Sequence, residues 1–354
     1  MARPGRWLDL GALKPLALHA AYAGVAQAMG DESAPVLIWA RADRPHVSLG
    51  ASQSAAAELD LGACRAAGVE LVARPLGGGT VLIDPAQYGL FLVVPRRRLA
   101  DRHAALFAAC LPAMAAVLGD FGLQAQPVGA TDVWVGGRKL VGSGAATIGR
   151  ALVFGASFLV RFEAELFARL VHCPSAGFRR WLAEALAEGL TGWAEQGEAP
   201  GETELAAAVR RRFASALACD WQDAPLSAAE HAALEQARAE LIEERQALLE
   251  GAIGGARRLV ANGIKVNHRS YLVEQGGEDE PGGWLRLWLR EGRIARIACA
   301  DAELSDGLQV CVGMPAEGQA LRGPLASALR GGADEYWAGR IERLAADVRR
   351  VSRE

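Results

Sequence analysis

The 354-residue chain lacks several features from which classes of protein are recognised. Its six cysteines form no Cys-x-x-Cys pair, and no histidines cluster near them. This pattern argues against a structural zinc site and a disulfide framework, and it is typical of a reducing compartment. No segment reaches the roughly 18–20 apolar residues of a membrane span, because Arg, Asp, Gly and Pro interrupt each candidate. We therefore expect a soluble protein that does not enter a membrane.

The charge and the N-terminus exclude further classes. A net charge of −3 leaves no basic surplus for binding nucleic acid. Residues 1–30 start with basic residues, but they contain no clean apolar block followed by a small-residue cleavage site. We interpret this segment as part of the fold and expect a cytoplasmic protein.

Lysine is the scarcest charged residue. Only Lys14, Lys139 and Lys265 are found among 38 basic residues. A chain that uses Arg almost everywhere can need a compact ammonium where it places Lys. This draws attention to Lys139, which lies in a glycine-rich segment.

The hydrophobic pattern predicts an α+β fold with a mixed, mostly antiparallel sheet flanked by helices. Strands are predicted at 34–40 and 46–50, a helix at 56–68, and a strand-turn-strand unit over 69–84. A strand at 88–95, a buried helix over 99–122 and three strands within 132–160 follow. Length favours two domains, and we place a catalytic domain at 1–250 and a small α+β accessory domain at 251–354.

The first candidate site is the segment Arg74-Pro-Leu-Gly77-Gly78-Gly79-Thr80, which continues to Asp84. Glycines remove side chains, so backbone N–H groups can face an anion or an extended ligand, and an Arg adds charge. The alternative interpretation is an ordinary turn between two strands.

The second candidate site is the segment Gly136-Gly137-Arg138-Lys139-Leu-Val-Gly142-Ser143-Gly144. A strand lysine flanked by small residues can approach a carboxylate or phosphate oxygen directly. The alternative is a solvated lysine on a sheet face.

Together these segments resemble the superfamily of biotin/lipoate protein ligases and octanoyltransferases, and most of all its lipoate-protein ligase branch. That branch has a Trp, a Pro-x-Val-x-x-Gly-x-x-Gln strand, an Arg-x-x-Gly-Gly-Gly loop and an Asn-Asp…Gly-Arg-Lys-x-x-Gly-Ser-Ala segment. The resemblance covers about residues 30–165. The matching residues are Trp39, Pro45, Val47, Gly50, Gln53, Arg74, Gly77, Gly78, Gly79, Val81, Asp84, Asp132, Gly137, Arg138, Lys139, Gly142 and Ser143.

The resemblance implies a function and a set of site residues. It implies activation of lipoate or octanoate with ATP and Mg²⁺ as an acyl-adenylate, followed by transfer to a lysine of a lipoyl-type acceptor domain. Lys139 is then the catalytic residue, Arg74 contacts the nucleotide phosphate, and Asp132 positions metal or nucleotide. The remaining candidates for substrate or cofactor contact are Gly77, Gly78, Gly79, Thr80, Asp84, Arg138, Gly142, Ser143 and Gly155.

Other observations keep alternatives open. Several polar positions of the family differ here, at Ile83, Gln87 or Tyr88, Thr131, Gly144 and Phe154. These losses would suit a non-catalytic partner that binds a lipoyl domain. Biotin is a less favoured substrate.

A second alternative is an ATP-independent transferase, because the transferase branch uses a Lys and a downstream Cys. Cys173 follows His172 in a segment that faintly resembles that Cys motif. A thiol beside a histidine can form a thioester. The opposing interpretation is a small buried cysteine. A separate resemblance of 282–304 and 324–344 to the accessory domain of two-domain lipoate-protein ligases favours the ligase branch, because single-domain transferases lack it.

Overall fold

The computed structural model describes residues 3–99, 103–250, 260, 262–277, 283–329 and 333–351. The chain divides into two compact units, each described here by itself. The first comprises Met1–Glu163 and Leu190–Gly255, and the second comprises Ala164–Gly189 and Ala256–Glu354. The break predicted near residue 250 lies close to the end of the first unit. The predicted catalytic domain wrongly included Ala164–Gly189, which packs in the second unit.

The first unit is built on an eight-stranded sheet with the order β11-β1-β2-β6-β10-β9-β8-β7. The two pairs that β1 forms, with β11 and with β2, are parallel, and every other pair is antiparallel. The predicted mixed, mostly antiparallel sheet is therefore confirmed. Its strands are β1 (Arg3–Leu13), β2 (Val36–Ala42), β6 (Gln87–Pro95), β7 (Ala125–Val128), β8 (Asp132–Val135), β9 (Arg138–Ile148), β10 (Ala151–Leu159) and β11 (Cys219–Asp223).

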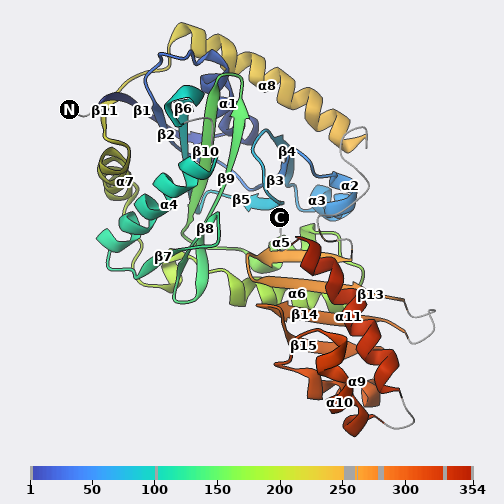
Figure 1. The fold of residues 1–354 in the computed structure, drawn as a ribbon. Coiled ribbons are helices and arrows are strands. Elements are labelled where there is room, and N and C mark those ends of the chain that lie inside the picture. Colours follow the sequence, from blue (N-terminus) through green and yellow to red (C-terminus); the bar gives the residue numbers. More distant parts are fainter. Residues whose placement is uncertain are drawn as a thin grey trace. The chain divides into compact units, whose positions relative to one another are not determined.

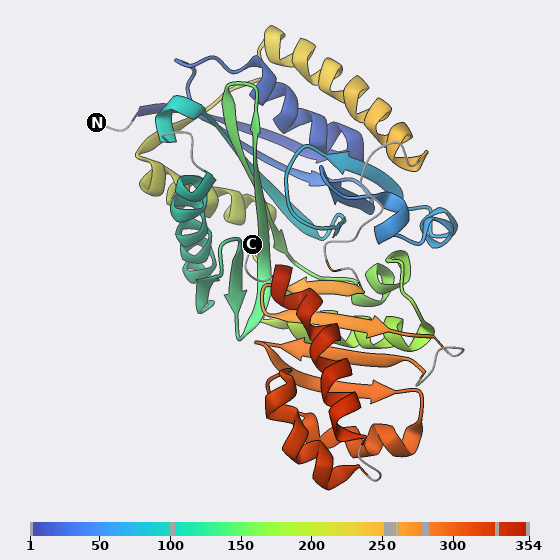
Figure 2. The ribbon, with the colours of Figure 1, turned by 45° about the vertical axis from the view of Figure 1, so that its right-hand side comes forward.

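Helices cover both faces of this sheet, so its central strands are apolar on both sides (Figures 1 and 2). Helices α1 (Pro15–Ala28) and α8 (Ala228–Leu249) pack side by side on one face. On the other face α4 (His103–Asp120) packs with α7 (Glu202–Leu217). Residues 1–30, predicted to be part of the fold, form β1 and α1.

Helix α4 has the length and hydropathy of a membrane-spanning helix. In this fold, however, Leu106, Met114 and Leu118 on α4 are fully buried against the sheet. The helix has the apolar composition expected of a core helix.

A smaller sheet with the order β4-β3-β5 carries the glycine segment. Strand β3 (His46–Gly50) pairs in parallel with β4 (Glu70–Arg74) and antiparallel with β5 (Val81–Ile83). The predicted strand-turn-strand unit is therefore not a hairpin, because β3 lies between its two strands. The single helix predicted over 56–68 was also wrong. It is divided into α2 (Ala55–Glu58) and α3 (Leu61–Ala66), because the Asp60 side chain accepts a hydrogen bond from Ala63 N and caps the second helix.

The second unit contains a four-stranded antiparallel sheet with the order β12-β13-β14-β15. Helix α6 packs against β12 and β13, and α11 packs against β13 and β14. The unit consists of α5 (Ala164–Leu170), α6 (Ala176–Gly189), β12 (Gly263–Asn267), β13 (Ser270–Gln275), β14 (Leu285–Arg290), β15 (Arg293–Cys299), α9 (Ala302–Leu308), η3 (Gln309–Cys311), α10 (Gly318–Ala328) and α11 (Asp334–Val351). The short helices η1 (Arg96–Leu99) and η2 (Trp193–Glu195) belong to the first unit.

Candidate functional site

A register shift in the hairpin of β8 and β9 determines the face of the sheet on which the Lys139 side chain lies. Asp132 pairs with Gly142 and Val133 with Val141, but Trp134 pairs with Lys139, so Leu140 is the additional residue of a bulge. Regular alternation would turn Lys139 and Gly142 to opposite faces, because they are three residues apart. The bulge instead turns Leu140 into the core beside Val141 and leaves Lys139 on the same face as Gly142.

The Lys139 ammonium has a defined place on this face. Its Nζ lies 2.9 Å from Asp132 Oδ1, and the Lys139 side chain keeps 23% of its surface exposed. A Cβ atom on Gly142 would lie only 2.9 Å from Lys139 Cε and 3.0 Å from Nζ. Gly142 therefore provides the space in which the lysine lies. The strand itself is held at this point, because Thr191 N donates to Lys139 O at 2.9 Å.

Asp132 was predicted to position metal or nucleotide. Its carboxylate pairs with Lys139 and accepts a second hydrogen bond from Thr131 Oγ1 at 3.3 Å. Within the described residues no group of three or more His, Cys, Asp or Glu side chains could hold a metal ion. Within this part of the chain the contacts that the structure shows for the Asp132 carboxylate are its ion pair with Lys139 and the hydrogen bond from Thr131.

The glycine segment lies close to protein backbone on two sides. A Cβ atom on Gly50 would lie 2.0 Å from Gly78 O, and one on Gly144 would lie 2.9 Å from Gly77 O. Gly78 has a φ of +99°, which favours glycine. Close packing against this loop thus explains why Gly50 and Gly144 lack side chains, whereas the backbone conformation explains Gly78.

Gly79 and Thr80 are different. A Cβ atom on Gly79 would have no neighbour within 4 Å among the described residues, and Gly79 is exposed. The Thr80 hydroxyl is buried, yet none of the described residues gives it a hydrogen-bond partner. At this end of the loop neither packing nor hydrogen bonding explains the residues, as expected where a ligand lies.

Arg74 has another role than the predicted contact with a nucleotide phosphate. Its guanidinium is buried and donates to Ser48 O at 2.7 Å, Gly79 O at 2.6 Å and Gly77 O at 3.1 Å. Burial lowers the pKa of Arg74 to about 10. Since its donors bind carbonyl oxygens of Gly77 and Gly79, Arg74 stabilises the conformation of the glycine loop.

Asp84 and Gly155 also serve local structure. The Asp84 side chain accepts from Ala86 N at 2.8 Å, which closes the turn before β6, and burial raises the pKa of its carboxyl group. Gly155 provides space for Leu76, because a Cβ atom there would lie 2.6 Å from Leu76 Cδ1. These two predicted site residues support the loop rather than form an open surface.

Arg138 and Ser143 point away from Lys139. Arg138 pairs with Glu195 at 2.7 Å, whereas Ser143 Oγ donates to Thr131 O at 2.6 Å. Ser143 follows Gly142 on a regular part of β9, so it faces the opposite side of the sheet. The structure therefore groups Lys139, Asp132 and Gly142 but not Ser143.

Ser157 on β10 was missed by the sequence analysis. It is the register partner of Gly142 and therefore shares its face. No motif marks this position, and the pairing of Ser157 with Gly142 depends on a strand register that the sequence alone does not show.

Cys173 belongs to the second unit. Its Sγ donates to Val171 O at 3.5 Å and Ala168 O at 3.9 Å. Both contacts join the thiol to main-chain carbonyl groups, and they give no support to an activated nucleophile.

Positions where the resembling family has polar residues contribute here to packing. Phe154 is fully buried and makes an edge contact with Phe107, with ring centroids 5.8 Å apart. Ile83 pairs with His46 between β5 and β3, and Gln87 Nε2 donates to Leu82 O at 2.9 Å. The apolar residues at two of these positions, Ile83 and Phe154, are thus accommodated within the fold.

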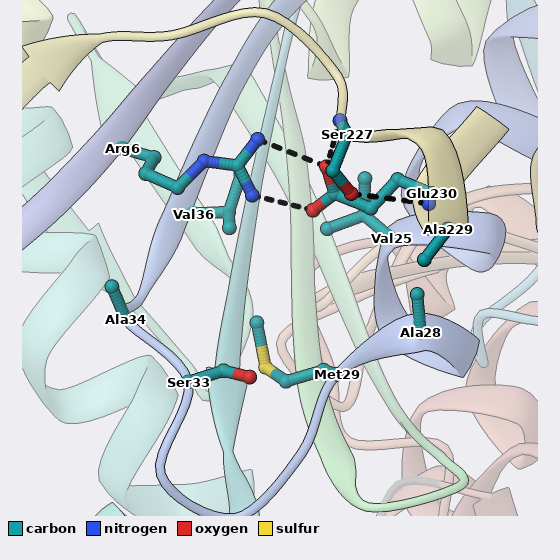
Figure 3. Close-up of a pocket in the computed structure, with 10 residues that line it drawn as sticks. All are labelled: Arg6, Val25, Ala28, Met29, Ser33, Ala34, Val36, Ser227, Ala229 and Glu230. Carbon is teal, nitrogen blue, oxygen red and sulfur yellow. Dashed lines mark hydrogen bonds and ion pairs between the residues drawn. The ribbon is translucent and has the colours of Figure 1, made fainter.

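A separate cavity of about 200 Å³ is lined by residues of β1, β2, α1, the segment between α1 and β2, and the start of α8, as Figure 3 shows. Arg6 and Glu230 face each other across it and form an ion pair of 2.5 Å. None of the predicted site residues lines it. It is smaller than the roughly 300–1,000 Å³ of ligand pockets, and its charged groups neutralise each other.

Comparison with known proteins identifies the family of this chain. The family model of the lipoyl protein ligase A/B catalytic domain matches residues 15–211, which is more than half of the chain. An Aeropyrum pernix protein named "Putative lipoate-protein ligase A" is 29% identical over 134 residues, 38% of this chain and 49% of that protein. The chain thus spans about half the length of this curated relative.

Solved structures show the same fold. A bi-partite lipoate protein ligase from Thermoplasma acidophilum, studied with its E2 lipoyl domain, aligns over 67% of this chain and 93% of its own (TM-score 0.62, 22% identity). A lipoate-protein ligase A bound with ATP aligns over 67% and 95% (TM-score 0.59, 21% identity). P. falciparum LipL1 in complex with lipoate aligns over 96% and 98% (TM-score 0.56, 14% identity). With its glycine loop and its strand lysine in place, the chain belongs to the lipoyl protein ligase A/B catalytic domain family.

Proposed function

We propose that this protein is a lipoate-protein ligase, which activates lipoate or a similar medium-chain acid with ATP and transfers it to a lysine of a lipoyl-type acceptor domain. The observation that carries the proposal is the position of the Lys139 ammonium. The bulge in β9 turns Lys139 to the face of Gly142, and the Asp132 carboxylate forms an ion pair with it there. Lys139 lies within residues 15–211, the part of the chain that matches the lipoyl protein ligase A/B catalytic domain, and this match supports the proposal.

The chemistry explains why a lysine is suited to this position. In the first step a carboxylate oxygen of the acid bonds to the α-phosphorus of ATP, and pyrophosphate leaves. In the second step the acceptor amine bonds to the acyl carbon, AMP leaves and the amine loses a proton. Lys139 stabilises the negative charge on the reacting oxygens in both steps, and neither step needs a nucleophile from the enzyme.

Solved structures of the same fold support the choice of ligands. ATP is bound in one of these proteins, lipoate in another, and a third was studied with its E2 lipoyl domain. The exposed backbone at Gly79, and the Thr80 hydroxyl, which has no hydrogen-bond partner among the described residues, would suit an acyl or phosphate oxygen of such a ligand.

Mg²⁺ is part of the proposal as a cofactor that neutralises charge on the phosphates. It commonly binds through one or two carboxylates, together with substrate phosphates and water. The Asp132 carboxylate, which forms the ion pair with Lys139, would contribute one carboxylate ligand to Mg²⁺.

The test is lipoate-dependent exchange of pyrophosphate into ATP by the purified chain. We expect exchange that requires both lipoate and Mg²⁺ and that falls at least 100-fold in Lys139→Ala, as for loss of one charge-stabilising group. Lys14→Ala, at an exposed lysine before α1, is the matched control and should retain activity. Absence of exchange in the wild-type protein, with transfer of an octanoyl group that Cys173→Ser abolishes, would establish the transferase instead.

A further inference from the structure

Ser157 occupies an opening in an otherwise buried strand. Every other residue of β10 is buried, whereas Ser157 retains partial exposure. Its face is defined by Gly155 two residues earlier, whose missing Cβ is directed at Leu76 beside the glycine loop. The Ser157 side chain therefore points to the loop side of the sheet.

The register places Ser157 close to Lys139. Ser157 and Gly142 are directly opposite on neighbouring antiparallel strands, where side chains lie about 4.5–5.5 Å apart at Cβ. The Lys139 Nζ atom lies 3.0 Å from the position of a Gly142 Cβ. A ligand atom that contacts the ammonium is therefore within reach of the Ser157 hydroxyl.

The hydroxyl is oriented but weakly bonded. Ser157 Oγ donates to Gln87 Oε1 at 3.5 Å, at the limit of hydrogen-bond length. Gln87 is held in turn by its bond to Leu82 O. A stronger acceptor, such as a carboxylate oxygen, would attract the Ser157 proton in preference to this amide oxygen.

We propose that Ser157 is a substrate-binding residue that donates a hydrogen bond to the carboxylate of the acid held by Lys139. This inference rests on the proposed function, because it assumes that the Lys139 site binds a carboxylic acid. Lys139 provides the positive charge that attracts the carboxylate, and the Ser157 hydrogen bond fixes the orientation of the carboxylate. Together they orient one oxygen for reaction. Ser157 is not among the residues that carry the resemblance to the family.

The experiment compares Ser157→Ala, Ser157→Thr and the control Thr147→Ala in the lipoate-dependent exchange assay. Thr147 lies on β9, where its hydroxyl contacts the exposed His103. We expect Ser157→Ala to raise KM for lipoate about 10-fold, as for one charge-assisted hydrogen bond. In Ser157→Ala, KM for ATP and kcat should stay within about twofold of wild type, and Tm should stay within about 2 °C. Ser157→Thr should keep KM for lipoate within about threefold of wild type.

The outcomes separate the two claims. Active wild-type protein with an unchanged KM for lipoate in Ser157→Ala would overturn the role of Ser157 and leave the ligase proposal standing. Equal changes in both KM values together with a lower Tm would show a structural role and also overturn it. Wild-type protein that neither supports exchange nor binds lipoate by calorimetry would contradict both claims.

Discussion

At the scale of the residue, the site depends on space left by a missing side chain. Gly142 has no role in a turn and no φ in the left-handed range, yet a methyl group there would meet the end of the Lys139 side chain. That side chain is flexible, so it would move at little cost to folding. A substitution of Gly142 should therefore change activity without changing stability much.

We predict that Gly142→Ala reduces lipoate-dependent exchange at least 10-fold, because it displaces the ammonium from Asp132. The free energy of unfolding should change by less than about 0.5–1 kcal/mol, as for substitutions that disturb no core contact. Urea unfolding and exchange kinetics of the same preparation provide the two measurements. Full activity in this variant would show that the position of Lys139 over Gly142 is not needed.

A buried histidine pair predicts how stability depends on pH. His46 Nε2 lies 3.1 Å from His19 Nε2, and both side chains are buried; sequence analysis expected no metal site from these histidines. Burial lowers the pKa of His46 to about 4, whereas burial, His46 and then Arg74 lower that of His19. The unfolded chain therefore binds more protons below its histidine pKa of about 6.5.

Because the folded pKa is the lower one, stability should fall as the pH decreases from about 6.5 towards 4. The slope is about 1.4 kcal/mol per pH unit for each histidine in this window. We expect His46→Gln to reduce the slope measured by urea unfolding between pH 7 and 5. Equal slopes in the variant and the wild-type protein would show that His46 is not held neutral by burial.

At the scale of the element, the glycine loop divides into a packed part and an open part. Gly50→Ala places a methyl group against Gly78 O and should destabilise the protein by about 1–3 kcal/mol. Gly79→Ala meets open space and should leave the unfolding free energy nearly unchanged, while it lowers activity if a ligand lies on the loop. The two variants are a matched pair, compared by urea unfolding and exchange activity. Full activity in Gly79→Ala would contradict ligand contact at that residue.

Much of this arrangement could be predicted from sequence, and the remainder depends on pairing between distant strands. Apolar alternation and glycine punctuation predicted β8, β9 and β10, and the scarcity of lysine singled out Lys139. The same pattern could not reveal that β3 separates β4 from β5, since strand order is a tertiary property. Nor could it place Ser157 opposite Gly142 or direct Arg74 inward, because both depend on register and burial.

At the scale of the whole molecule, the second unit is assembled from two segments of the chain. Arg286 and Glu274 form a buried ion pair, and Ser175 from the segment before α6 hydrogen-bonds to both. Arg286 also lies over the Trp181 ring of α6, 5.1 Å from its centroid. Helix α6 is therefore part of the core of this unit, although it precedes the rest of the unit by more than 60 residues.

We expect residues 256–354 alone to form an unstable domain, because removal of α6 exposes an otherwise buried charged pair. A chain that joins 164–189 to 256–354 through a flexible linker should unfold cooperatively, with a Tm at least about 10 °C higher. Thermal unfolding followed by circular dichroism compares the two fragments. Equal transitions would mean that α6 adds nothing to this unit.

The most direct test of the central claim is the intact mass of a purified lipoyl domain after incubation with this protein, lipoate and Mg²⁺, with and without ATP. A ligase predicts a mass gain of one lipoyl group that requires ATP, is lost in Lys139→Ala and is retained in Lys14→Ala. A lipoyl domain of unchanged mass under both conditions, with wild-type protein that is folded, would contradict the account and favour a non-catalytic binding partner.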